Sequence, residues 1–369
     1  MKKMNNIITS IVFVAFIGIF FLITALKPQK NFSQTENRYL AKKPDFTWKT
    51  LLSGEFATDY EEYLSDQFVL RDKWITLKTQ SELMIGKNQV NGVYFAADNY
   101  LIENAAINDE ELMYRNEQRL IEFIQQHDNA RAMIVPTAAM ILSEKLPVYA
   151  EVFNQNEVID AIKAETGEQF IDVRQVLEDH DNEYIYYRTD HHWTTLGAYY
   201  AYVQWAQSIG LTPYALEDFQ VEEASRSFLG TLYSKVNMVT AYDTIDLYHL
   251  EGMEYEVVYN MQDTEDTLYM RKYLDEKDKY SVYLGGNNAM VEVNTNVDND
   301  RVLLIIKDSY AHCFAPFAVN HFAKTVMIDF RYLKMPLSEV IEEYGVTDIL
   351  VLYNTIHFSN DTNMSMFEY

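Results

Sequence analysis

The sequence predicts an α/β fold in which helices flank a parallel sheet. Short, continuous apolar runs of the kind that buried parallel strands require recur along the chain, and segments with apolar residues at helical spacing separate several of them. The chain has 369 residues, of which 48% are hydrophobic and 14% aromatic, so it can bury a large core. We therefore expect one large α/β domain with additions.

The first addition is an apolar run over residues 7–26. At about 1.5 Å per residue in a helix, this run is long enough to cross a bilayer core of about 30 Å. Lys2 and Lys3 precede it, which predicts that residues 1–6 are cytoplasmic and that the rest of the chain is extracytoplasmic. A cleaved signal peptide is the alternative, but the run is longer than a signal core and ends without a small-residue cleavage pattern. We predict an uncleaved, single-pass signal anchor.

A linker and the extracytoplasmic domain follow the anchor. Residues 27–50 are polar, contain two prolines and carry mixed charge, which is typical of a tether. The domain is expected over 51–369. Apolar residues at helical spacing within 51–83 predict two helices that lie against it, and two β-prone runs within 90–102 predict a hairpin.

The helix and strand alternation begins at residue 109. Periodicity predicts helices over 109–126, 156–165, 195–208 and 337–344. Buried runs predict strands over 131–136, 170–172, 301–306, 325–330 and 348–353. Between them, residues 225–297 are rich in Tyr, Thr, Val and charge in alternating segments, which predicts an inserted β-rich, antiparallel region.

Composition excludes several classes of function. The 55 acidic and 30 basic residues give a formal charge of -25, which repels nucleic acid, so we expect no nucleic-acid partner. Cys313 is the single cysteine of the sequence, which excludes an intrachain disulfide and a cysteine-rich zinc site.

The polar run over residues 188–197 combines an acid with two imidazoles. Asp190 and His192 have the chemistry of a general base held by a carboxylate, because an acceptor on the far ring nitrogen fixes the tautomer of the imidazole. Residues two apart in an extended segment project to the same side, so these two side chains are expected to face one cleft while His191 points away. The alternative is a polar turn in which one of the following threonines caps a helix.

Ser309 follows a predicted strand. Residues 302–306 lead into Asp308 and Ser309 and then into a helix-compatible run, and open α/β sheets bind ligands at the carboxyl ends of their strands. Ser309 is therefore the candidate nucleophile, with amides of the helix N-terminus available to an oxyanion, although a capping role is equally compatible with this junction taken alone. His312 is a rival base that a helical position favours for packing, and Cys313 stands where a small buried hydrophobe would.

With these residues the chain resembles the DHHW protein family, which is grouped with SGNH-hydrolase-like polysaccharide O-acetyltransferases such as the alginate acetylation proteins. The complete signature is Asp190-His191-His192-Trp193. Other similar stretches are 36–41, 66–71, 91–94, 283–287 and 307–310. The resemblance covers nearly the whole chain from about residue 31.

The resemblance implies a permuted SGNH-like fold in which Asp190 and His192 precede the nucleophile Ser309. It also implies a polysaccharide substrate and a multi-pass membrane acyltransferase that supplies acetyl groups. We expect no cofactor and no metal. Tyr310 is expected to line the oxyanion or substrate site, although alginate-type sites continue with serine where this chain has Ala311.

Gly286 and Asn287 are further candidates for the oxyanion or substrate site. A Gly-Gly-Asn turn brings an amide and a carboxamide close to a ligand, although a turn without a function fits the same residues equally well. These candidates lead us to expect a membrane-anchored O-acetyltransferase or acetylesterase that uses Ser309, His192 and Asp190 on a cell-surface or exported polysaccharide.

Two other classes of function stay open. Asp-His-His also begins a motif of manganese phosphoesterases, but residues 131–172 contain no Asp-x-Asp run that would supply further ligands. A non-catalytic polysaccharide-binding or assembly protein with the same fold would suit the aromatic-rich composition.

Overall fold

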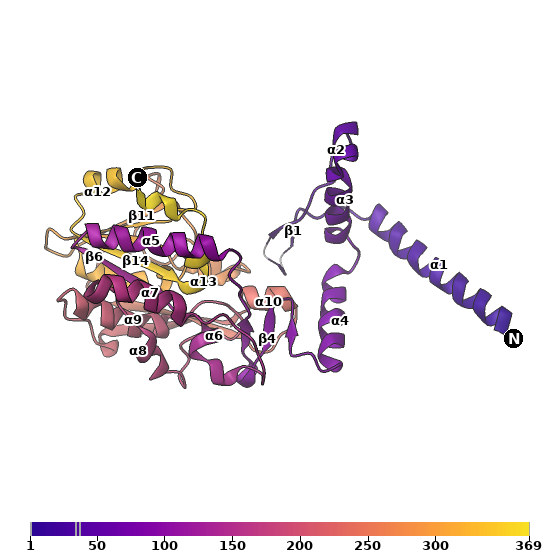
Figure 1. Ribbon diagram of the computed structural model, residues 1–369, viewed down its shortest axis with the longest axis horizontal. Helices are drawn as coiled ribbons and strands as arrows, with labels where there is room; N and C mark the ends of the chain where they lie inside the picture. Colours follow the sequence, from indigo (N-terminus) through magenta and orange to yellow (C-terminus); the bar gives the residue numbers. More distant parts are fainter. Residues whose placement is uncertain (1, 34, 37, 369) are drawn as a thin grey trace. The chain divides into compact units, whose positions relative to one another are not determined.

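The computed structural model describes residues 2–33, 35–36 and 38–368, and the chain forms two compact units (Figure 1). Unit 1 comprises Met1–Lys87 and Ser234–Met238, and unit 2 comprises Asn88–Tyr233 and Val239–Tyr369. The division at Lys87 differs from the predicted boundary at residue 50, because the helices between these positions pack with the N-terminal segment. Asn37 of the 36–41 stretch and the side chains of Lys2 and Lys3 lie outside the described part.

Unit 1 consists mainly of helices. They are α1 (Lys2–Leu26), α2 (Trp48–Ser53), α3 (Glu55–Asp66) and α4 (Arg71–Met84). Residues Met4–Leu26 of α1 form a helix that is long and apolar enough to cross a membrane. Three helices take the place of the two that were predicted, because Gly54 adopts a left-handed conformation with φ of 83° and separates α2 from α3.

The predicted linker contains regular structure. Strand β1 (Phe32–Ser33) pairs with β2 (Arg38–Tyr39). Asp66, a buried residue of α3, accepts hydrogen bonds from Arg38 at 2.5 Å and from the Ala41 amide at 2.8 Å. This carboxylate therefore holds part of the linker against the helices of unit 1.

Unit 2 contains a seven-stranded mixed sheet in the order β10-β9-β11-β13-β12-β14-β6. Its four parallel strands are β6 (Ala130–Val135), β12 (Val302–Lys307), β13 (Lys324–Ile328) and β14 (Asp348–Asn354). Strands β9 (Tyr255–Tyr259), β10 (Asp263–Glu265) and β11 (Met290–Thr295) extend it in antiparallel fashion. Three strands of the β-rich segment 225–297 thus extend the main sheet.

The strand predicted at 170–172 is reduced to one bridge between Phe170 and Ala132. The Asp172 carboxylate accepts a hydrogen bond from the Arg174 amide at the start of α8 (Arg174–Glu178), so the chain turns away from the sheet edge.

Two smaller sheets complete the strands of unit 2. Strands β3 (Gln89–Val90), β4 (Val93–Phe95) and β5 (Leu101–Glu103) form one of them, in which β4 and β5 are the predicted hairpin. The other pairs β7 (Phe219–Phe228) with β8 (Asp243–Leu250).

Helices cover both faces of the main sheet. Leu303 and Ile305 of β12 lie in one buried cluster, whereas Leu304 and Ile306 lie in the other. Helices α9 (Thr195–Ser208) and α11 (Ala311–Ala318) contribute to the first cluster, and α5 (Glu110–Gln126), α7 (Asn156–Thr166) and α12 (Leu337–Tyr344) contribute to the second. Figure 1 shows α5 and α7 side by side next to β6. Short helices are α6 (Ala138–Ile141), α10 (Thr231–Val236) and α13 (Thr355–Asn360).

Candidate active site

The turn between β12 and α11 presents Ser309 at the carboxyl edge of the parallel strands. Asp308 is buried beside it and accepts hydrogen bonds from the Tyr310 amide at 2.8 Å, the Asn354 amide at 2.9 Å and the Asn354 side chain at 2.7 Å. These bonds fix the turn to the end of the neighbouring strand β14. Ser309 itself is only partly buried, so its hydroxyl stands at the surface of a rigid junction.

The loop that carries the imidazoles is closed by backbone pairing. Tyr186 bridges Trp193, and the Tyr187 amide donates to the His192 carbonyl at 3.2 Å. Thr194 caps α9, since its hydroxyl oxygen accepts from the Gly197 amide at 3.3 Å. The capping interpretation is therefore correct for Thr194, while the side chains of Asp190 and His192 remain available for other contacts.

Asp190, His192 and Ser309 form a continuous hydrogen-bonded row. His192 Nδ1 lies 2.5 Å from Asp190 Oδ1, and His192 Nε2 lies 2.7 Å from Ser309 Oγ. Asp190 Oδ2 accepts from the Thr231 amide at 2.7 Å, which fixes the carboxylate from its other side. Burial would raise the pKa of Asp190, but His192, His191 and these hydrogen bonds hold the pKa well below its ordinary value. The carboxylate is therefore charged and faces the imidazole.

Tyr280 contacts both His192 and Ser309. Its ring stacks on the His192 ring with centroids 3.9 Å apart and planes inclined by 10°. Its hydroxyl lies 2.9 Å from the Ser309 carbonyl, to which it donates. No local pattern in the sequence distinguishes Tyr280, because it lies in the β-rich segment, where many tyrosines are core residues.

Comparison with known proteins identifies the family. A match to the family described as DHHW protein spans residues 120–328. The chain belongs to the DHHW protein family. The search of curated proteins found no match.

Solved structures show the same fold. A DHHW family protein from Eubacterium siraeum DSM 15702 is 26% identical over 76% of this chain and 96% of that one, with a TM-score of 0.65. Bacillus cereus PatB1, solved with a sulfonyl adduct, is 19% identical over 75% of this chain and 97% of its own, with a TM-score of 0.61. The O-acetyltransferase domain of Pseudomonas putida AlgJ is 15% identical over 75% of this chain and 99% of its own, with a TM-score of 0.45.

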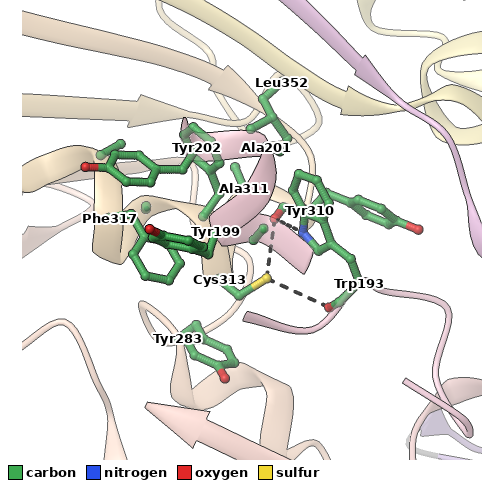
Figure 2. Close-up of a cluster of buried hydrophobic side chains, with 14 of the residues drawn as sticks. Trp193, Tyr199, Ala201, Tyr202, Tyr283, Tyr310, Ala311, Cys313, Phe317 and Leu352 are labelled. Atoms are coloured by element: carbon green, nitrogen blue, oxygen red, sulfur yellow. Dashed lines mark hydrogen bonds between the residues drawn. The ribbon is translucent and has the colours of Figure 1, made fainter. Parts of the chain in front are cut away.

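The DHHW residues each contact the site in a different way. Besides Asp190 and His192, the signature supplies His191, whose carbonyl accepts from the buried Tyr310 hydroxyl at 2.6 Å and whose Nδ1 lies 2.7 Å from Thr231 Oγ1. Trp193 is fully buried, and its indole N–H donates to the Tyr310 carbonyl at 2.9 Å (Figure 2). Together with the contact between His192 and Ser309, these bonds connect the imidazole loop to the nucleophile turn at three points.

Tyr310 does not have the side-chain environment predicted for a substrate-binding residue. It is fully buried and its hydroxyl is engaged by the His191 carbonyl, so its side chain joins the two segments of the site. Cys313 lies below it, with Sγ 3.8 Å from the Tyr310 carbonyl (Figure 2). Burial raises the pKa of the Cys313 thiol to about 12, which agrees with a packing role.

His312 also lies away from the Ser309 hydroxyl. It is buried, and its Nε2 lies 3.0 Å from Nζ of the buried Lys307. Burial lowers the pKa of His312 well below its ordinary value, and the charge of Lys307 lowers it further. His192, and not His312, is therefore the imidazole beside Ser309.

The predicted oxyanion role of Gly286 is wrong for its backbone amide, which donates to the Tyr283 carbonyl at 3.2 Å within the turn. Gly286 has φ of 80°, and a Cβ there would lie 2.7 Å from Ser281 Oγ, so the turn itself requires glycine. Asn287 is exposed, and its Oδ1 accepts from Arg331 at 3.4 Å. Among the described residues, neither Gly286 nor Asn287 makes a hydrogen bond to Asp190, His192 or Ser309.

Asp190, His191 and His192 each offer a potential metal ligand within 4.8 Å of one another. Two ligands of a tetrahedral ion at about 2.1 Å lie about 3.4 Å apart. Asp190 Oδ1 and His192 Nδ1 are separated by 2.5 Å, which is a hydrogen-bond distance and too short for two ligands of one ion. The geometry here suits a proton-sharing pair.

Two further residues support the acid. A Cβ at Gly230 would lie 2.2 Å from Asp190 Cβ and 2.3 Å from its Oδ2, so only glycine allows the loop to approach this closely. Asp243 is fully buried and accepts from the Thr189 amide at 2.8 Å and the Thr189 hydroxyl at 2.6 Å. Neither residue has a local sequence pattern that would have identified it.

Proposed function

We propose that this DHHW protein is a membrane-anchored, extracytoplasmic O-acetyltransferase or acetylesterase that acts on a cell-surface or exported polysaccharide. The observation that supports this proposal is the position of His192 between a charged carboxylate at 2.5 Å and a serine hydroxyl at 2.7 Å. The chain order, Asp190 and His192 before Ser309, is the one expected of a permuted SGNH-like arrangement.

The chemistry begins with acylation of Ser309. Its Oγ attacks the carbonyl carbon of an acetyl ester while His192 Nε2 takes the hydroxyl proton, and Asp190 stabilises the imidazolium through Nδ1. His192 then returns the proton to the departing alkoxide. The acetyl group is left on Ser309 as an ester.

Deacylation reverses these roles. His192 takes a proton from a sugar hydroxyl or from water, whose oxygen attacks the acetyl-serine, and Ser309 leaves as it regains the proton. A sugar acceptor makes the protein a transferase and water makes it an esterase. Among the described residues the Ser309 amide has no hydrogen-bond partner, so it is the amide that we assign to the oxyanion of both steps.

The membrane part of the proposal rests on α1, whose length and apolar composition suit a single span. One span offers no route for an acetyl group across a bilayer, so a transferase of this kind requires a multi-pass acyltransferase as donor. The related fold of PatB1 carries a sulfonyl adduct, which recommends a sulfonyl fluoride as the chemical probe for an activated serine in this chain.

The test uses the full-length protein in detergent and compares it with Ser309→Ala. We expect hydrolysis of p-nitrophenyl acetate by the native protein and one sulfonyl adduct on the peptide that contains Ser309. Ser309→Ala should lose both, while the free energy of unfolding changes by less than about 1 kcal/mol, since Tyr310 is the N-cap of α11 and, among the described residues, the Ser309 hydroxyl contacts only His192.

Cys313→Ala is the matched control, because it removes the other nucleophile of the same turn and helix and should keep both signals. Acetyl transfer to added oligosaccharide distinguishes a transferase from an esterase. Unchanged hydrolysis in Ser309→Ala would contradict the proposal, and oligosaccharide binding without any turnover would favour a non-catalytic binding protein.

A further inference from the structure

The segment that follows α1 has the opposite charge to the rest of the chain. Residues 27–49 contain six basic and two acidic residues and so carry +4, whereas the whole chain carries -25 and the remainder therefore -29. A local cluster of basic residues in an acidic protein attracts anionic groups at short range, within about 10 Å at moderate salt. Because the basic segment directly follows an apolar helix, its positive charge is complementary to the negative charge of an anionic lipid surface.

The lysines of this segment are not neutralised by the protein. Arg38 forms ion pairs with Glu36 and Asp66. Within the part of the chain that the structure describes, no ion pair includes Lys27, Lys30, Lys42, Lys43 or Lys49. Lys27 and Lys30 line a pocket of about 440 Å³ together with apolar residues such as Phe68 and Leu70, and the acids Asp66 and Asp72 line it as well. Cationic and apolar groups therefore share one surface of unit 1.

Large apolar side chains are exposed beside these lysines. The exposed fraction is 54% for Phe46, 72% for Trp48 and 85% for Leu52, and helix α2 has no buried residue. The Phe46 ring makes edge contacts with Trp48 and Phe56 at centroid distances of 5.5 and 5.3 Å, which hold the aromatic group together. Tryptophan and phenylalanine interleaved with lysine are typical of segments at a membrane interface.

We propose that residues 27–33 and 38–52 bind the surface of a bilayer that contains anionic phospholipid. The lysines contact headgroup phosphates, and Phe46, Trp48 and Leu52 enter the boundary between headgroups and acyl chains. The inference rests on the proposed anchoring by α1. Unit 1 carries both elements, since the Val69 amide donates to Thr24 of α1 at 3.3 Å and the rings of Phe20 and Trp74 lie 5.6 Å apart.

The test places a fluorescent probe at position 52 of the full-length protein. Cys313 is fully buried, so Leu52→Cys is the site that an environment-sensitive thiol reagent labels. The labelled protein is reconstituted in vesicles of phosphatidylcholine with or without phosphatidylglycerol, in both cases with brominated acyl chains. We expect a blue shift and strong quenching that increase with phosphatidylglycerol, and no quenching of the same probe at the exposed position of Asp300 in unit 2.

Charge reversal provides the second measurement. Each basic residue near an anionic surface changes partitioning by about fivefold, so Lys42→Glu with Lys43→Glu should remove most of the phosphatidylglycerol-dependent quenching at position 52. Lys78→Glu with Lys87→Glu makes the same charge change elsewhere in unit 1 and should leave it in place.

Equal signals at positions 52 and 300, or quenching that ignores both phosphatidylglycerol and charge reversal, would overturn the proposal. A signal that requires a co-reconstituted multi-pass protein would assign the surface to a protein partner and would also overturn it. Carbonate extraction of the same vesicles measures the insertion of α1 separately, and esterase assays measure the Ser309 chemistry, so failure here is distinguishable from failure of the proposed function.

Discussion

The turn that carries Ser309 is associated with two pairs of an aspartate and a histidine. In the first pair, His192 Nδ1 lies 2.5 Å from the Asp190 carboxylate, and His192 Nε2 contacts the Ser309 hydroxyl. In the second, Asp308 and His357 are 3.3 Å apart, but Asp308 also accepts from the Tyr310 amide and from Asn354. The Asp190 carboxylate orients an imidazole toward the Ser309 hydroxyl, whereas the Asp308 carboxylate mainly accepts hydrogen bonds from backbone amides.

The difference shows that an acid and an imidazole in contact do not identify a catalytic site. Burial would raise the pKa of the acid in both pairs, but the attraction of the histidine and the hydrogen bonds exceed this effect and lower the pKa of each carboxyl group. What distinguishes them is the third partner. His192 has a partly exposed hydroxyl beyond it, while the His357 ring stacks on Tyr353 with centroids 5.8 Å apart.

The largest expected effect is a loss of turnover when the acid of the first pair is changed. Asp190→Asn reverses a hydrogen-bond partner of His192 and favours the wrong tautomer, so kcat for p-nitrophenyl acetate should fall by about 10⁴-fold with the fold retained. His191→Ala is the control, because its ring faces Thr231 and not Ser309, and should keep a substantial part of the activity. Equal losses in both variants together with lowered melting temperatures would mean that the stretch is structural.

The second prediction concerns stability. Asp308→Ala leaves the amides of Tyr310 and Asn354 without an acceptor inside the protein, which should lower the free energy of unfolding by about 3 kcal/mol, as seen in urea denaturation. Asp190→Asn should change the same quantity far less. If Asp308→Ala instead abolished turnover without loss of stability, the second pair would have to be included in the chemistry.

The third prediction tests Tyr280 as a positioning residue. Tyr280→Phe keeps the ring on His192 but removes the hydrogen bond to the Ser309 carbonyl, so kcat should fall by about fivefold to tenfold, the equivalent of about 1 kcal/mol, with KM unchanged.

Tyr280→Leu removes the stacked ring as well and should lower kcat further. A rise in KM alone would indicate that Tyr280 contacts substrate. Melting temperatures of both variants serve as the control for a purely structural role.

The smallest effect is a pH dependence of the second pair. Burial would lower the pKa of His357, but Asp308 raises it overall. A raised pKa in the folded state stabilises the protein below the unfolded pKa of about 6.5, and this contribution is lost as the pH rises through the folded pKa. The free energy of unfolding of the native protein should therefore exceed that of His357→Gln by about 1 kcal/mol or less at pH 5.5. Chemical denaturation at a series of pH values should show this difference shrinking toward alkaline pH. A difference that grows with pH would contradict the assigned ion pair.

The sequence predicted those parts of the molecule that depend on local pattern. Helices α5, α7 and α12 follow from apolar periodicity, and β12 and β14 from buried runs. Asp190, His192 and Ser309 could be selected because a short motif and the end of a strand carry them.

The remainder depends on contacts between distant segments. The pairing of β11 with the parallel strand β13, and of β9 with β11, is fixed by neighbours across the sheet, and no pattern within 225–297 encodes it. Tyr280 acquires its role from the approach of two other segments, and the Gly286 amide loses its predicted role to a hydrogen bond inside its own turn.

Gly230 places an evolutionary constraint on the acid of the site. The Cβ of any other residue at this position would lie 2.2 Å from Asp190 Cβ, so a substitution would displace either the loop or the carboxylate. A family member that replaces this glycine would need a different backbone path through the loop. Position 230 therefore offers a diagnostic for DHHW sequences that keep the four signature letters, since a larger residue there marks a chain whose acid no longer stands where this one does.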